Sequence, residues 1–446
     1  MPKGGVEMKK SVVSLFLLVL IVIMNFVGCT ESENFGDVKN RMTYYTSNDS
    51  DDFCDLIKIY NNYCLQNYDK SYQIAVLKFA SEDEINTKLS TELMAGKGPD
   101  IISINQKFPF EKLLNNGTFL DVNKLCDNNT QADKIDFNNF NSAIMKCGIY
   151  NGKRYIVPLF YGTDVFVSTQ EKLKKFNVSC DNHTVLTYKN LSEKFSSFSN
   201  EKANLGFISG YNDTNSMFNY PMQLFNRFIN NYVDFENKAV YFDTDEFKDN
   251  LDVMMQMLTI SQKNNTNELF DGLYINRSFP LMAGNYSYYQ SINETPVVFR
   301  GLTKNKDVNS AHIQAGYAIN NNTQLKEQAL AFIKYTLSDE IQEIGATASG
   351  SLSFPVNMSV YDNAKLVAGS KTDDNNKIIG IDNDFMKAYI NIADNVNACT
   401  LYRDVSHSYY NDNVIGDIVD DYINKGISKD KFIRQLTSAT EIYLTE

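Results

Sequence analysis

The sequence predicts an α/β protein made of two domains. Its 446 residues exceed what one compact hydrophobic core of ordinary size organises. Segments with the residue pattern of strands alternate with segments that carry apolar residues at helical spacing, which is typical of α/β folds with largely parallel sheets. The composition is that of a globular protein, with 43% hydrophobic and 22% charged residues.

The alternation starts at residue 41. The first expected elements are a strand at 41–46, a helix at 51–67 and a strand at 72–79. A capping box then runs from Ser81 to Glu84, where a hydroxyl and a carboxylate each bond a free backbone donor at a helix start. The helix that follows is expected to end at Gly96, and a third strand is expected at 100–104.

The last part of the chain is expected to be helical. Residues 325–337 carry apolar side chains on one face, and a second apolar stripe begins at Ile415 and ends before Gly426. Ser428 is expected to cap a final helix that buries Phe432 and Leu436.

Charge and cysteine content exclude several classes of partner. The formal net charge of -12 argues against nucleic acid and leaves nothing for an anionic lipid surface to attract. The cysteines after residue 29 show no metal-ligand spacing, so neither a metal nor a cofactor is expected, and we interpret them as buried thiols. Cys54 and Cys64 lie too far apart along one expected helix to bridge each other; other pairings stay open.

The N-terminus has the features of an export signal. Basic residues at positions 3, 9 and 10 precede the apolar run 12–23, which is short for a membrane span but suits a signal peptide. The run ends at Gly28 and Cys29, which resemble the lipobox of bacterial lipoproteins. The resemblance implies a signal peptide at 1–28, an acylated Cys29, a linker at 29–40 and a location on the extracellular face of the cell membrane. An ordinary signal peptide with an incidental cysteine is the alternative, and either Met1 or Met8 can be the start.

Signatures of catalysis are few. The histidines His183, His312 and His407 form no HExxH pattern, and no GxSxG, Walker or GxGxxG segment occurs. Residues 428–431 spell SxxK, which a helix cap explains better than a nucleophile. We therefore predict no catalytic residue and no enzyme.

Several segments resemble the extracellular solute-binding proteins of family 1, the receptors of ABC importers for sugars and related solutes. Residues 92–102 match the family's AGxGPD turn, 150–158 its DGKxYxxP hairpin, and 316–335 its YAI and FIK block. The Pro355-Val356 loop and the tail from Tyr422 follow in the family's order.

The resemblance implies a two-lobed periplasmic-binding-protein-like clamshell with mainly parallel sheets and a hinge. One lobe would comprise 41–163 and 317–360, the other 164–316 and 361–446, with crossings near 162–164, 314–316 and 360–368. The implied partners are a small-molecule solute, most simply a mono- to oligosaccharide, and the permease subunits of the importer. The membrane would be contacted only through the lipid anchor.

Ligand residues follow from the chemistry of sugars, which present an apolar face and a rim of hydroxyls. The chain has 27 tyrosines and no tryptophan, so tyrosine would supply the stacking surface. The candidates lie at the end of the first strand, at the first crossing, where the family carries tryptophan, and in two further segments: Tyr44, Tyr45, Tyr161, Asp164, Tyr211, Asn285, Tyr286, Tyr409 and Tyr410. For each tyrosine, an aromatic residue of the core or surface is the alternative interpretation.

Two other functions remain open at this point. A sensory or adhesive lipoprotein could use the same clamshell, and an anchored extracellular enzyme is the more distant alternative. The sequence does not name the solute.

Overall fold

A computed structural model describes the following residues: 40–47, 54–104, 110–128, 134–163, 165–175, 179–190, 225–226, 228–235, 237–263, 274–276, 286, 289–304, 306–347, 354–357, 359–360, 382–401 and 410–445. The chain divides into two compact units, Met1–Lys88 and Leu89–Glu446. In the part that the structure describes, no helix combines the length and the apolar character needed to cross a membrane.

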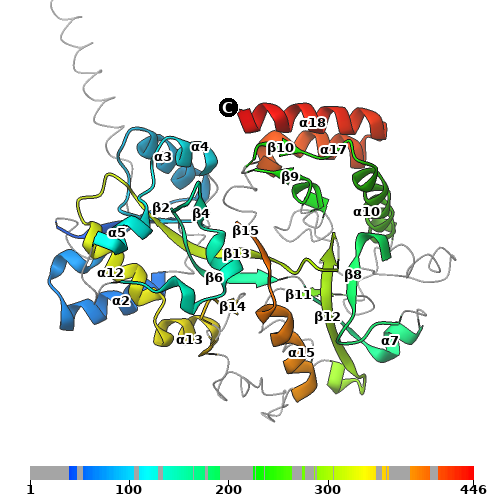
Figure 1. The fold of residues 1–446 in the computed structure, drawn as a ribbon, viewed down its shortest axis with the longest axis horizontal. Helices are drawn as coiled ribbons and strands as arrows, with labels where there is room; N and C mark the ends of the chain where they lie inside the picture. The colour runs from blue at the N-terminus through cyan, green and yellow to red at the C-terminus, as the bar shows by residue number, and fades with distance from the viewer. Residues whose placement is uncertain are drawn as a thin grey trace, which may run out of the picture. The chain divides into compact units, whose positions relative to one another are not determined.

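The first unit is built on a parallel strand pair. Strands β1 (Met42–Ser47) and β2 (Ile74–Phe79) pair along their whole length, and helix α2 (Cys54–Asn67) connects them (Figure 1). The Asn61 side chain fixes the start of β2, because its amide donates to the Ile74 carbonyl and its oxygen accepts from the Ile74 amide. The expected strand, helix and strand are confirmed.

The capping box is also confirmed. The Ser81 hydroxyl accepts from the Glu84 amide at 3.2 Å, and the Glu84 carboxylate accepts from the Ala80 amide at 3.0 Å. These bonds satisfy backbone donors at the start of helix α3 (Glu82–Met94). Gly96 follows the helix with a φ of 70°, a conformation that favours glycine.

The second unit contains a sheet centred on β13 (Ser310–Ile319). This strand pairs antiparallel with β3 (Ile101–Ser103) and β6 (Val157–Thr163), and parallel with β15 (Ala398–Leu401) (Figure 1). Strand β14 (Phe354–Pro355) adds to the free edge of β6.

A further four-stranded sheet has the order β11-β7-β12-β8. Its strands are β7 (Val165–Thr169), β8 (Val185–Thr187), β11 (Tyr274–Asn276) and β12 (Pro296–Thr303). Strand β8 runs parallel to β12, while β7 runs antiparallel to both β11 and β12. Both sheets of this unit therefore mix the expected parallel pairs with antiparallel pairs.

The remaining elements of the described residues are short hairpins, turns and helices: α4 (Phe110–Asn115), α5 (Val122–Asn128), η3 (Phe137–Asn139), α6 (Ser142–Lys146), β4 (Ile149–Tyr150), β5 (Lys153–Arg154), α7 (Gln170–Lys175), β9 (Val233–Asp234), β10 (Ala239–Val240), α10 (Asp245–Lys263), α12 (Lys326–Thr336), α13 (Asp339–Thr347), α15 (Asn383–Asp394), the π-helix η6 (Tyr410–Val414), α17 (Gly416–Asn424) and α18 (Lys429–Thr445), with η1 (Lys70–Tyr72) in the first unit.

A buried arginine anchors the β4–β5 hairpin. The Arg154 guanidinium donates to the Asn123 side chain at 3.0 Å and to the Met145 carbonyl at 2.6 Å, and it covers the Phe137 ring. Burial lowers the pKa of Arg154 to about 10, because removal from water disfavours the charged form. The turn of this hairpin, expected from the sequence, has positive φ at Asn151 and Gly152.

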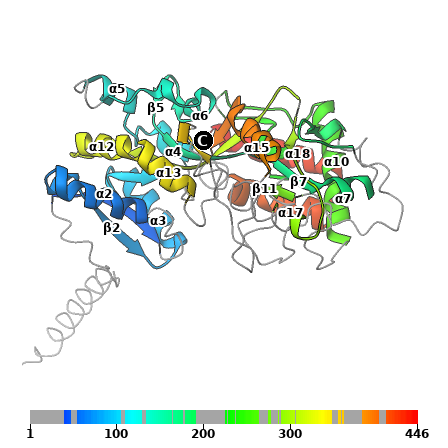
Figure 2. The ribbon, with the colours of Figure 1, turned by 90° about the horizontal axis from the view of Figure 1, so that it is seen from below.

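An aromatic core joins α10, α17 and α18. The rings of Phe228 and Phe247 stack 5.1 Å apart, and those of Tyr422 and Phe432 stack 4.1 Å apart. Helices α17 and α18 pack side by side in both views (Figure 1 and Figure 2). The Ser428 hydroxyl accepts from the Lys431 amide at 3.3 Å, so the residues that spell SxxK are a helix cap, as expected.

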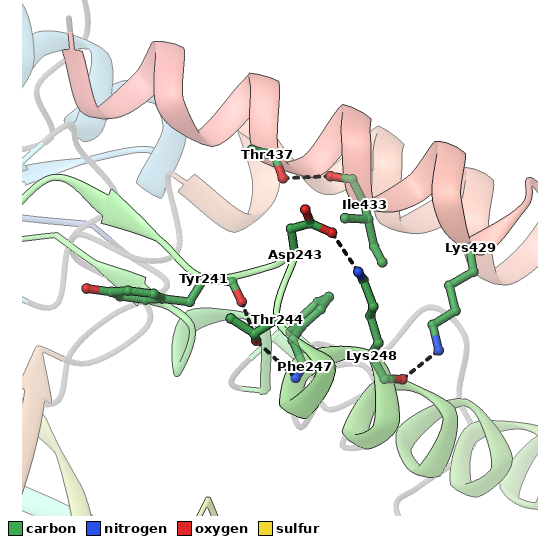
Figure 3. Close-up of polar contacts among 8 residues, drawn as sticks. All are labelled: Tyr241, Asp243, Thr244, Phe247, Lys248, Lys429, Ile433 and Thr437. Atoms are coloured by element: carbon green, nitrogen blue, oxygen red, sulfur yellow. Dashed lines mark hydrogen bonds and ion pairs between the residues drawn. The ribbon is translucent and has the colours of Figure 1, made fainter.

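Polar contacts at the starts of α10 and α18 tie the two helices together (Figure 3). The Lys429 ammonium donates to the Lys248 carbonyl at 2.6 Å. It also lies 2.8 Å from an Asp252 carboxylate oxygen. The Lys248 side chain in turn reaches the Asp243 carboxylate at 2.6 Å.

A second polar turn precedes β8. The Asp181 carboxylate accepts from the Thr184 hydroxyl at 2.9 Å and from the His183 amide at 3.0 Å. These bonds stabilise the charged form, so the pKa of Asp181 is lowered.

The cysteines whose side chains the structure describes form no disulfide with one another. Cys64, Cys126 and Cys180 are buried, which confirms that interpretation for them, while Cys147 and Cys399 are partly exposed. The side chain of Cys54 lies outside the described part.

Candidate functional site

Two strand pairs pass from one sheet of the second unit into the other. A single residue separates β6 from β7, and residues 304–309 separate β12 from β13 (Figure 1). The crossings stay paired on both sides, because Thr163 opposes Ala311 in one sheet and Val165 opposes Arg300 in the other. The Thr163 hydroxyl also donates to the Ser310 carbonyl at 2.9 Å. We call β6, β7, β12 and β13 the hinge strands.

The first expected crossing, near 162–164, falls between β6 and β7, whereas residues 314–316 lie inside β13. Gly316 serves close packing there, since a Cβ atom at this position would lie 2.7 Å from the Val157 carbonyl oxygen. The third expected crossing begins at Val360, and most of it lies outside the described residues.

A polar pair lies on the hinge strands. His312 is buried and Gln314 is half-buried, and their side chains meet with the two Nε2 atoms 3.1 Å apart. An amide nitrogen only donates, so the Gln314 side chain can donate to Nε2 of His312 when that atom carries no proton. Gly162 on the neighbouring strand makes room for the pair, because a Cβ there would lie 2.7 Å from either Nε2 atom.

Arg300 lies on the other side of the crossing. Its guanidinium donates to the carbonyl of Lys306 in the connecting segment. Its Nε–H is buried and makes no hydrogen bond within the described residues. Partial burial lowers the pKa of Arg300, which nevertheless stays charged at neutral pH. Together with His312 and Gln314, it offers donors and acceptors suited to a hydroxylated or anionic solute.

The segment between α15 and β15 is fastened to the start of β13. The Asn309 side chain donates to the Ile392 carbonyl at 2.6 Å, and the Asn309 amide donates to the Asn397 side chain at 2.8 Å. This places β15, which the sequence assigned to the second lobe, in the same sheet as β6 and β13.

Tyr161 and Tyr286, two of the predicted ligand residues, both contact α15, but at opposite ends. The buried Tyr161 donates its hydroxyl to the Ala393 carbonyl at 3.2 Å. The Tyr286 hydroxyl accepts from the amide of Asp382, the N-cap, at 2.9 Å, and its ring leans on Phe385. Ala393 comes eleven positions after Asp382, which corresponds to about 16 Å along the helix axis. Tyr286 is 4% exposed.

Tyr410 belongs to the aromatic core. It is fully buried, and its hydroxyl lies 2.6 Å from Oγ1 of Thr440. The Thr440 proton is used in a bond to the Leu436 carbonyl, so Tyr410 is the donor. Its contacts are therefore with protein groups.

Tyr44 and Tyr45 point to opposite faces of β1. Tyr44 is 3% exposed, whereas Tyr45 is half-buried with its ring centroid 5.1 Å from that of Phe79. The Lys88 ammonium lies over the Phe79 ring, 4.9 Å from its centroid. Because β1 and β2 are parallel, Tyr45 and Phe79 form an aromatic pair at the carboxyl edge of the first unit. The other predicted site residues lie outside the described part: Cys29, Asp164, Tyr211, Asn285 and Tyr409.

His312, Gln314 and Arg300 were not among the sequence candidates. A usable signal existed for the first two, since polar residues occupy alternate positions 310, 312 and 314 of an otherwise apolar strand. Within the described residues, no group of three or more His, Cys, Asp or Glu side chains could hold a metal ion.

The chain belongs to the family of bacterial extracellular solute-binding proteins, which its sequence matches over residues 56–374. This confirms the family that the ordered motifs indicated. No curated protein matches the sequence significantly.

Solved structures share the fold at low sequence identity. The sugar-binding protein MalE of Xanthomonas citri is 12% identical with a TM-score of 0.62, covering 91% of this chain and 97% of its own. The GacH receptor of Streptomyces glaucescens, solved without ligand and with acarbose, is 14% identical with a TM-score of 0.56, covering 91% and 98%. UgpB of Mycobacterium tuberculosis in complex with glycerophosphocholine is 12% identical with a TM-score of 0.59, covering 91% and 98%. These likenesses confirm the α/β fold of the two-lobed periplasmic binding proteins.

Proposed function

We propose that this protein is the lipid-anchored receptor of an ABC importer and captures a carbohydrate outside the cell. The family match carries the proposal, and the hinge strands support it because they connect two sheets by paired crossings. Receptors with this organisation bind by closing two lobes on a ligand that contacts both.

The ligand class rests on chemistry and on relatives. MalE is a sugar-binding protein and GacH was solved with acarbose. Within the second unit, His312, Gln314 and Arg300 supply hydrogen-bonding groups. Within the first unit, the Tyr45–Phe79 pair supplies an apolar surface, which is tested separately below. UgpB was solved with glycerophosphocholine, so a phosphodiester is the competing ligand to test.

A ligand screen tests the proposal. The purified protein is heated with mono-, di- and oligosaccharides and with glycerophosphodiesters, and positive compounds are titrated by calorimetry. A carbohydrate should raise Tm, because it binds only the folded state. If only phosphodiesters raise Tm, the ligand is a phosphodiester and not a carbohydrate. If a bound ligand leaves the radius of gyration from small-angle scattering unchanged, the lobes do not close on it.

The aromatic pair gives a sharper test with a matched control. Tyr45→Ala should weaken carbohydrate binding by about 1–3 kcal/mol, the usual cost of losing an aromatic contact, with a small change in Tm. Tyr44→Ala removes the same ring from the buried face, so it should lower stability and leave the affinity of the folded fraction unchanged. The reverse pattern would exclude Tyr45 from the site.

Tyr286 stays a proposed ligand contact, together with Asp164, Tyr211, Asn285 and Tyr409. Tyr286→Phe keeps the ring and removes the bond to the Asp382 amide. If the ring stacks on sugar, Tyr286→Ala should lower affinity far more than Tyr286→Phe. Equal affinity of both variants, with stability lost in Tyr286→Ala, would assign the residue to the core.

The anchor is tested separately. Cells fed a clickable fatty acid should label the wild-type protein at Cys29 and leave Cys29→Ala unlabelled. Equal labelling of the wild-type protein and Cys29→Ala would mean that Cys29 is not acylated and that the protein is exported without a lipid anchor. Loss of solute uptake in Cys29→Ala cells that still secrete the protein would link the anchor to the permease subunits.

A further inference from the structure

Three tyrosine rings form a continuous row on the first unit. The Tyr68 ring stacks on that of Tyr72 with the centroids 4.4 Å apart, and its centroid lies 5.9 Å from that of Tyr63. Tyr63 and Tyr68 are exposed, and Tyr72 is half-buried. Residues 59–68, which supply two of the rings, carry no charged side chain, although the whole chain has a net charge of -12. We call Tyr63, Tyr68 and Tyr72 the tyrosine row.

The tyrosine row lies at the amino edge of the β1–β2 pair. Helix α2 leads from the carboxyl end of β1 back to the amino end of β2, so its last turn lies at that edge. Tyr72 ends the short helix η1, and the carbonyl of the next residue, Gln73, accepts from the Met42 amide at 3.0 Å. The Cys64 thiol donates to the Tyr72 carbonyl at 3.6 Å, which fastens the end of α2 to the same place.

The chain that leads to the proposed lipid anchor joins the first unit at the same edge. The first described residue, Asn40, has a φ of 65° and comes two positions before Met42, where β1 begins. Asn40 also comes eleven positions after Cys29, a length of chain that can span at most about 40 Å. A lipid on Cys29 would therefore keep the amino edge close to the membrane surface. The carboxyl edge lies about 20 Å further along the six residues of β1.

We propose that the tyrosine row contacts the headgroup region of the membrane that holds the anchor. This contact presupposes the lipid anchor of the proposed function and adds to it a direct contact between the folded protein and lipid. Tyrosine suits the boundary between lipid and water, because its ring is apolar while its hydroxyl can bond water or a headgroup. Since residues 59–68 are uncharged, the contact does not have to remove a charged group from water.

The anchor makes a weak contact sufficient. A tethered surface meets the membrane at a high effective concentration, so the tyrosine row needs no affinity that would be measurable without the lipid. The contact would also orient the first unit. With its amino edge on the membrane, the carboxyl edge that carries Tyr45 and Phe79 would point away from the lipid and toward the solute.

The chain contains no tryptophan, so a single introduced tryptophan can report on this contact. Tyr68→Trp places the reporter in the tyrosine row, and Tyr241→Trp is the control on the second unit, since the two tyrosines are 43% and 47% exposed. Each full-length lipoprotein is inserted into phosphatidylcholine vesicles made with or without brominated acyl chains, which quench tryptophan that touches lipid. We expect brominated lipid to quench the emission of Tyr68→Trp and to leave that of Tyr241→Trp unchanged.

The mass of each protein separates failure of the contact from failure of the anchor. Unquenched emission of Tyr68→Trp in a protein that is acylated at Cys29 would overturn the inference and leave the anchor intact. A mass without acyl groups would refute the anchor and the contact that depends on it. Emission of Tyr68→Trp that changes with protein concentration but not with brominated lipid would assign the tyrosine row to contact between two copies of the chain.

Hydroxyl-radical footprinting repeats the test on the wild-type protein, so a folding defect of a variant cannot decide the outcome. On vesicles, Tyr68 should be oxidised more slowly than Tyr241, because lipid would cover only the first of these similarly exposed rings. Equal rates of oxidation in the acylated protein would overturn the inference.

Discussion

Gly162 makes a direct test of how the hinge strands are packed. In Gly162→Ala, the new Cβ would lie 2.7 Å from Nε2 of both His312 and Gln314, closer than real Cβ contacts come. Both obstacles are the far ends of side chains, so they can rotate away without moving the backbone. The rotation breaks their mutual contact, worth about 1 kcal/mol, and crowds a buried site. Overpacking of this kind costs about 1–3 kcal/mol, so we expect a loss near 2 kcal/mol.

Urea unfolding measures this loss as a lower midpoint at an unchanged slope. Truncating one obstacle should recover part of it, so Gly162→Ala with Gln314→Ala should cost less than the sum of the single variants. Gly416→Ala is the control, since its Cβ would lie 3.1 Å from one carbonyl and alanine favours the helix start. A loss below about 0.5 kcal/mol in Gly162→Ala, or strict additivity in the double variant, would refute the packing that we describe.

Three further predictions concern stability. Arg154→Met should lower the free energy of unfolding in urea by about 2–4 kcal/mol, because the acceptors on Asn123 and Met145 lose their hydrogen-bond donor. Lys153→Met, at the exposed neighbouring position, should change it by less than about 0.5 kcal/mol. Asp181→Asn should lower Tm at neutral pH but not in acid. The lowered pKa of Asp181 stabilises the fold above the unfolded-state pKa, and this stabilisation is lost as the pH falls through the folded-state pKa. An equal loss of Tm at both pH values would contradict this explanation. Lys429→Met should lower the free energy of unfolding by about 0.2–1 kcal/mol, and the part of this loss that comes from the ion pair with Asp252 should shrink in high salt. A loss that does not depend on salt would assign the effect to the contact with the Lys248 carbonyl alone.

Local signals in the sequence were reliable where the physics is local. The strand expected at 41–46 is observed at Met42–Ser47, and the helix expected at 325–337 is observed at Lys326–Thr336. The start of β2 moved from residue 72 to Ile74, because Asp69 accepts from the Ser71 amide and caps a short turn first. Such side-chain caps act within three residues and leave a weaker pattern than an apolar stripe does.

The predicted ligand residues could be located along the chain but not in space. Tyr161 lies in a strand near a crossing and Tyr410 in a late segment, positions where ligand residues were expected. In the structure, however, the Tyr161 hydroxyl bonds the Ala393 carbonyl and the Tyr410 hydroxyl bonds Thr440. The same residue type serves both purposes in this tyrosine-rich chain, so only tertiary contacts separate core from site. His312 was passed over because a single histidine on an apolar strand carries little information without its neighbour on the next strand.

The unequal lengths of the two crossings limit how the two sheets can move. Each residue contributes two soft torsions, so the one-residue link between β6 and β7 allows very few internal rotations, while residues 304–309 allow many. If the two sheets slid past each other, the one-residue link would have to lengthen, which its covalent geometry does not allow. A rotation about that link changes only torsion angles, and the longer link of residues 304–309 can adjust to the new distance between its ends. We therefore expect a rotation of the two sheets to turn about the short link between β6 and β7. Inserting one glycine into the one-residue link would therefore add proportionally more torsional freedom than the same insertion into residues 304–309.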